Sequence, residues 1–140
     1  MSSNPRFSSP RFLSRVMWAD AASCAATGAL QLGLTGTLAA LTGLPTALLS
    51  GTGLFLLAYA ALAAAMARRA RPPRTLIGLV ALGNLGWAIA CLALAASGLF
   101  ALSSWGIAWL LAQAVCVIVL AELQWTGLRR TRGAPAAALA

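Results

Sequence analysis

The chain has 140 residues, of which 61% are hydrophobic and only 9% are charged. An ordinary soluble domain is about half apolar and about a quarter charged, and a chain this short cannot bury so much apolar surface within itself. The composition therefore excludes a water-soluble globular protein and a disordered one. It predicts an integral membrane protein, and we expect no nucleic-acid partner despite the formal net charge of +8.

The positive charges, all of them Arg, divide the chain into two long apolar intervals. They are Arg6, Arg11 and Arg15, then Arg68, Arg69, Arg71 and Arg74, and finally Arg129, Arg130 and Arg132. Each long interval between clusters holds a single charged residue, Asp20 in the first and Glu122 in the second. A membrane-spanning helix needs about 20 apolar residues, so each interval is too long for one span and fits two spans with a turn.

Turn residues place the elements in chain order. Thr35-Gly36-Thr37 and Gly43-Leu44-Pro45 interrupt the first interval, with a short interfacial helix at 38–42 between them, and Ser97-Gly98 and Ser103-Ser104 bracket a loop in the second. The expected spans are about 13–35, 46–67, 75–97 and 104–127. Together they predict an all-α, four-helix transmembrane bundle, up-down-up-down, made of two helical hairpins. We expect one four-span domain over residues 1–132 and a disordered tail over 133–140.

The Arg clusters also predict the orientation. All of them lie on the side shared by the N-terminus, the middle connection and the C-terminus, and the opposite loops carry no charge. By the positive-inside rule, that side and both termini are cytoplasmic. We expect the first span to be uncleaved, because its apolar run is too long for a signal peptide and Asp20 interrupts it early. Arg without Lys, with abundant Ala, Leu and Gly, is typical of a high-GC bacterial genome, so the expected location is a bacterial inner membrane.

Polar residues within the spans are the candidate site. Asp20, Asn84 and Glu122 come from three different spans and lie at similar depth in the cytoplasmic half. Gln31 shares a helix face with Asp20, and Gln113 lies on a polar stripe of the fourth span. Intramembrane polar residues usually face the bundle interior, find partners and often mark function. The expected site is Asp20, Gln31, Asn84, Gln113 and Glu122, with Arg15 and Arg129 as charge partners.

Several alternatives stay open for these residues. If the first span began near Ala21, Asp20 would be a helix N-cap at headgroup depth. The polar groups can equally be structural links between helices. Glycines and alanines within the spans suit close helix packing, and the candidate glycines are Gly28, Gly33, Gly78, Gly83 and Gly86.

The sequence offers little for catalysis or cofactor binding. There is no His, and Cys24, Cys91 and Cys116 lie in three different spans without a Cys-x-x-Cys motif. A transition-metal or haem site lacks its usual ligands. Nothing positions a nucleophile beside Asp20 or Glu122. We therefore expect no enzyme activity, no catalytic residues, no metal and no cofactor.

Three motifs carry a family resemblance. They are Arg-Phe-Leu-x-Arg followed by Asp20, Gly83-Asn84-Leu85-Gly86-Trp87-Ala88, and Glu122-Leu-Gln124-Trp125-x-Gly-Leu-Arg129-Arg130. Over roughly residues 11–132 the chain resembles small bacterial four-span integral membrane proteins that have no assigned activity. Small multidrug resistance transporters also carry an acidic residue in the first span. This chain lacks that family's surrounding pattern, and its Arg residues are not split between two faces, so we do not assign it there.

Two functions follow as hypotheses. The leading one is a small membrane protein that acts as an oligomeric or accessory structural subunit, in a homo-oligomer or a larger membrane complex within the lipid bilayer. The alternative is a small proton-linked transporter or channel that uses Asp20 and Glu122 on an unidentified small molecule or ion. A cavity reaching Asp20, Asn84 and Glu122 from the cytoplasmic side would favour the alternative.

Overall fold

The computed structural model describes residues 10–69 and 73–131, and this part of the chain is all-helical. Its helices are Pro10–Gly33 (α1), Thr35–Thr42 (α2), Thr46–Ala67 (α3), Arg74–Ser97 (α4) and Ser104–Thr131 (α5). The expected helical bundle is confirmed, with five helices instead of four. The expected tail at 133–140, and Arg71 and Pro72 of the middle connection, lie outside the described residues.

The additional helix arises where the first hairpin turns. We expected a short helix at 38–42, and α2 begins earlier, at Thr35. The Thr35 hydroxyl lies 2.5 Å from the Gln31 carbonyl oxygen and 3.1 Å from that of Leu32. Such bonds from Ser or Thr back to the preceding turn bend helices, and α2 leaves α1 at 91°. Gly43 then ends α2 in the left-handed conformation, at φ 77°.

Three of the described helices, α3, α4 and α5, are long and apolar enough to cross a membrane. The bent pair of α1 and α2 meets the same test when it is taken together. These are the helices of a membrane protein. Because α1 packs lengthwise along α3, the two helices share the same depth.

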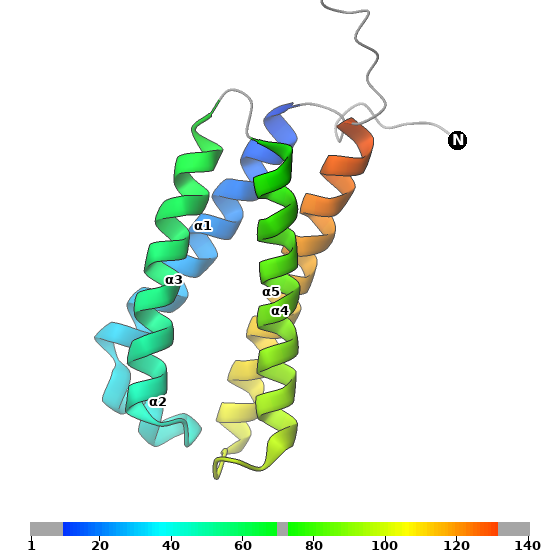
Figure 1. The fold of residues 1–140 in the computed structure, drawn as a ribbon. Helices are drawn as coiled ribbons and strands as arrows, with labels where there is room; N and C mark the ends of the chain where they lie inside the picture. The colour runs from blue at the N-terminus through cyan, green and yellow to red at the C-terminus, as the bar shows by residue number, and fades with distance from the viewer. Residues whose placement is uncertain (1–9, 70–72, 132–140) are drawn as a thin grey trace, which may run out of the picture.

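The helices form two antiparallel hairpins (Figure 1). One pairs α1 with α3, the other pairs α4 with α5, and the hairpins meet mainly where α1 packs on α5. The start of α1, the end of α3, the start of α4 and the end of α5 lie at one end of the bundle (Figure 1). Every described Arg is at this end, which we call the Arg end. The opposite end, which carries α2 and the α4–α5 connection, is the loop end.

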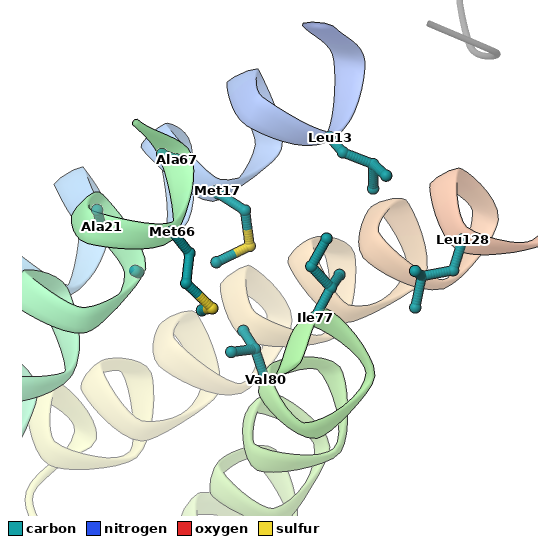
Figure 2. Close-up of a cluster of buried hydrophobic side chains, with 9 residues drawn as sticks. Leu13, Met17, Ala21, Met66, Ala67, Ile77, Val80 and Leu128 are labelled. Carbon is teal, nitrogen blue, oxygen red and sulfur yellow. The ribbon is translucent and has the colours of Figure 1, made fainter. Parts of the chain in front are cut away.

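A buried cluster of apolar side chains closes the Arg end. Figure 2 shows Met17 of α1, Met66 of α3, and Ile77 and Val80 of α4 pointing toward one another. Met17 and Ile77 are fully buried. Arg74 Nη2 donates a hydrogen bond to the Leu128 carbonyl and joins the start of α4 to the end of α5. The interior is therefore apolar between the Arg end and the polar residues deeper in the bundle.

Close packing of α1 on α3 depends on Gly28. A Cβ at Gly28 would lie 2.8 Å from the Gly53 carbonyl oxygen, which is too close for a backbone contact. Glycine at this crossing lets the two backbones approach. The expected role in close packing holds for only part of the set of glycines, because Gly33, Gly83 and Gly86 have open space where a Cβ would lie.

Gly28→Ala should destabilise the protein by about 1–3 kcal/mol, the usual cost of forcing an extra methyl group into a packed contact. Gly51→Ala is the matched control, because Gly51 lies in α3 with nothing within 4 Å of the point where a Cβ would lie. Replacing a helical glycine with alanine in open space should be neutral or stabilise by about 0.5–1 kcal/mol. Denaturant unfolding in bicelles measures both, and equal stabilities would contradict the close crossing.

Candidate functional site

The strongest polar feature of the interior is Asp20. It lies inside α1, about 15 Å along the helix axis from Pro10 at 1.5 Å per residue, and its exposed fraction is 0%. A position this far inside the helix excludes the alternative in which Asp20 caps the N-terminus. Asn84 and Gln31 are also buried, so all three face the bundle, as expected.

Donors from three other helices converge on one carboxylate oxygen of Asp20. Gln124 Nε2 of α5 lies 2.7 Å from Oδ2, and Asn84 Nδ2 of α4 lies 3.0 Å from it. The Tyr59 hydroxyl of α3 lies 3.4 Å from the same oxygen. We call Asp20, Tyr59, Asn84 and Gln124 the Asp20 cluster. It joins all four long helices at one point.

The two amides of the Asp20 cluster are also bonded to each other. Asn84 Nδ2 lies 3.3 Å from Gln124 Oε1, and Gln124 Nε2 lies 3.8 Å from the sulfur of Met17. Asp20 Oδ1 is contacted by the Cys24 thiol at 3.6 Å. Buried polar groups are costly unless they are hydrogen-bonded. The cluster meets this requirement with neutral donors, and its two amide nitrogens both face the carboxyl group.

The expected charge pairs do not form among the described residues. Arg15 is exposed and Asp20 is fully buried. At 3.6 residues per turn, positions five apart point in different directions around the helix. Arg129 shares a face with Glu122, but seven residues correspond to about 10 Å along the axis, and no ion pair joins the two. In both cases the two residues are close in sequence, but the helix either points their side chains in different directions or holds them too far apart for an ion pair.

Glu122 lies apart from the Asp20 cluster. Its side chain is exposed on the outer surface, in a groove of about 290 Å³ between α4 and α5. Leu82, Leu85 and Trp125 line the groove with it. Gln124 is only two residues along the chain, but two residues turn a helix by about 200°, so Gln124 faces the interior and Glu122 faces outward.

Gln31 and Gln113 mark a third location, nearer the loop end. The Gln31 side chain lies 2.9 Å from the Thr52 hydroxyl of α3. Gln113 Oε1 accepts a hydrogen bond from Trp87 Nε1 at 3.4 Å. Both glutamines line one cavity between the hairpins. The structure therefore divides the five expected site residues among the Asp20 cluster, the outer groove and this cavity.

Two members of the Asp20 cluster were not expected as site residues. Tyr59 is the single Tyr of the chain and lies in a span that has no charged or amide side chain, which is the signal that could have identified it. Gln124 shares a helical stripe with Gln113, and its polar side chain near Asp20's depth was a second available signal. Helix periodicity predicts the face of a helix on which a side chain lies. It does not predict which neighbouring helix packs against that face.

A cavity of about 80 Å³ adjoins the Asp20 cluster and is lined by Cys24, Tyr59, Asn84 and Trp87, among others. It has no residue in common with the groove at Glu122. Phe55 and Trp87 stack beside it, with their ring centroids 5.7 Å apart, and fill the space between α3 and α4. Over residues 10–69 and 73–131, no three His, Cys, Asp or Glu side chains gather into a metal site.

Comparison with models of protein families, with curated protein sequences and with solved structures finds no match to this chain. The function is therefore argued from the geometry of the bundle and its polar groups.

Asp20→Leu should destabilise the bundle by about 1–3 kcal/mol, because it leaves the amides of Asn84 and Gln124 without their shared acceptor. Asp20→Asn keeps one acceptor oxygen and should cost less. Ala22→Leu, at an exposed position of the same helix at nearly the same depth, serves as the control and should stay within about 0.5 kcal/mol of the native protein. Unfolding in bicelles measures the series. An Asp20→Leu protein as stable as the native one would show that the cluster does not hold the helices together.

Proposed function

We propose that this protein is a structural subunit of a bacterial inner membrane that assembles with a second copy of itself through the outer face of α4 and α5. The observation that carries the proposal is the exposed carboxylate of Glu122 on a face of α5 that is otherwise apolar up to Arg129 at its end. That face includes Leu111, Val115, Ile118 and Trp125, all of them exposed.

The position of Glu122 in the apolar layer raises the free energy of a single protomer, and a partner for the carboxylate would lower it. Glu122 lies about 12 Å from Arg130 along the helix, at 1.5 Å per residue, and so within the apolar part of α5. An acidic side chain near the middle of a membrane costs about 3 kcal/mol on insertion scales. Such residues usually face a bundle interior or a partner. Among the described residues, Glu122 has no hydrogen-bonding or charged partner, so a partner from outside the protomer fits it.

A second copy offers complementary chemistry on the same face. Trp125 is one helical turn from Glu122, lines the same groove and is 47% exposed. Its indole N–H is a donor only, and a carboxylate accepts. In a two-fold symmetric interface each surface meets its own copy, so Glu122 of one protomer can meet Trp125 of the other, and the reverse.

Small residues beside the groove allow a second helix to approach closely. Ala81 and Ala121 line its floor. Gly86 is exposed one turn beyond Leu82, with open space at its Cβ position. Small residues on an outer helix face are typical of helix–helix contacts in membranes, where packing and hydrogen bonds replace the hydrophobic effect.

The alternative function, a proton-linked transporter or channel, draws less support from this geometry. A transporter of this kind would use Asp20 and Glu122 together. Asp20 lies in the interior of the bundle, whereas Glu122 lies on its outer surface. The cavity beside Asn84 does not include Glu122, and the apolar cluster of Met17, Met66 and Ile77 lies between it and the Arg end. A partner subunit of a different sequence in a larger membrane complex is an outcome that the experiments below can detect.

Glu122→Leu should convert an assembled protein into a monomer, because the variant no longer needs a partner for a carboxylate in the apolar layer. Single-molecule photobleaching of the labelled full chain in lipid vesicles counts the copies, and we expect two for the native protein. The variant should fold at least as stably as the native protein, since a charge is removed from an apolar face.

Leu54→Val is the control for this experiment, because Leu54 is an exposed apolar residue of α3 that lies outside the proposed interface. It should leave the number of copies unchanged. A native protein that is monomeric in lipid, or a Glu122→Leu variant that still forms pairs, would contradict the proposed assembly. If pairing appeared only when a different protein was added, that protein, and not a second copy of this chain, would be the partner at this face.

The orientation of the bundle is a second prediction. We expect the Arg end to be cytoplasmic, because all described Arg residues lie there and the loop end has none. In a variant whose three cysteines are replaced by Ala, Leu99→Cys should react with a membrane-impermeant thiol reagent added outside intact cells. Arg69→Cys should react only after the membrane is permeabilised, and reaction of Arg69→Cys in intact cells would reverse the orientation.

A further inference from the structure

A cavity of about 130 Å³ lies between the two hairpins near the loop end. Its walls come from α1, α3, α4 and α5 and are mostly apolar, with Leu48, Leu49 and Leu94 among them. The side chains that bring polar atoms to it are Gln31, Thr52, Trp87, Trp109 and Gln113. An engineered, closed apolar cavity of about 150 Å³ in another protein binds benzene. The cavity described here has a similar volume and is partly open to the outside, so it suits a single ring with a small substituent.

Two N–H donors among the lining side chains lack acceptors. The indole Nε1 of Trp109 is buried and has no hydrogen-bond partner among the described residues. Gln113 uses its oxygen to accept from Trp87 Nε1. Because an indole can only donate, this contact fixes the orientation of the amide and leaves Gln113 Nε2 as a free donor. No acceptor for that nitrogen is found in the described part of the chain.

Both donors belong to residues of α5 that line the cavity. Trp109 and Gln113 are four residues apart on α5, so they are neighbours on one face of the helix. A buried donor that stays unpaired costs free energy, and a ligand acceptor relieves that cost. One carbonyl oxygen has two lone pairs and can accept from both groups. The remaining walls, which include the Trp87 ring, suit an apolar body.

The lining also indicates the charge of the occupant. None of the side chains that line the cavity is a cation or an acid. A charged ligand would therefore lie against mostly apolar walls without a counter-ion, which is costly. The chemistry that fits is an uncharged apolar molecule with a carbonyl group.

We propose that this cavity binds a small, uncharged ring compound whose carbonyl oxygen accepts hydrogen bonds from Trp109 Nε1 and Gln113 Nε2. The site is independent of the proposed assembly, because it shares no residue with the groove at Glu122. A failure of one proposal therefore leaves the other standing.

The test compares two probes that differ in one atom group. They are 4-fluoroacetophenone, which has a carbonyl, and 4-fluoro-α-methylstyrene, which has a CH₂ group in place of the carbonyl oxygen. The full chain is placed in phosphatidylcholine nanodiscs, and ¹⁹F NMR follows saturable binding, with empty nanodiscs as the control for partition into lipid. We expect saturable binding of both probes, with the carbonyl probe bound about threefold to tenfold more tightly, the usual worth of one or two neutral hydrogen bonds.

Variants identify the donors. Trp109→Phe and Gln113→Leu should each reduce the preference for the carbonyl probe while leaving the hydrocarbon probe bound, which also shows that the cavity is intact. Trp105→Phe, at a position 71% exposed and outside this cavity, should leave both probes unaffected. Equal affinity of the two probes for the native protein would overturn the proposal. Absence of saturable binding, as for a cavity that holds only water, would overturn it too.

Discussion

The bundle depends on the placement of one carboxyl group, that of Asp20, in the buried interior between the helices. A buried carboxyl needs donors, and here they come from a different helix in each case: Tyr59 of α3, Asn84 of α4 and Gln124 of α5. Each bond fixes the rotation and the height of its helix against α1. In a membrane, where apolar contact with lipid competes with contact between helices, such bonds act together with close packing to specify the arrangement.

The rest of the interior is arranged around this point. Toward the Arg end, apolar side chains such as Met17 and Ile77 fill the space between the hairpins. Toward the loop end, a second buried apolar cluster that includes Leu49 and Leu110 packs the hairpins together, and the Ser103 N–H donates a hydrogen bond to the Thr42 carbonyl oxygen at the end of α2. The α1–α5 contact and these loop-end contacts join the two hairpins, and the proposed ligand site lies between the hairpins near the loop end.

The sequence predicts the helices well and the site only in part. The Arg clusters and the Gly, Ser and Pro turns give α3 and α4 nearly to the residue, because span length and charge depend on local composition. The division of Asp20, Glu122 and Gln113 among three places could not be predicted, because it depends on how each helix is rotated against its neighbours. Glu122 and Gln124 illustrate the limit: both are polar and two residues apart, but Glu122 faces outward while Gln124 donates a hydrogen bond to Asp20.

The right-angle turn between α1 and α2 has a geometric consequence for the loop end. If α1 follows the membrane normal, a helix at 91° to it runs parallel to the membrane plane. Leu34 and Leu41 at the two ends of this segment are about half exposed, as are the apolar side chains of an interfacial helix. In that orientation, shifting the protein along the normal would move either these leucines into water or the polar groups of the loop end into hydrocarbon. The short helix would then set the depth of Asp20 and Glu122 below the surface.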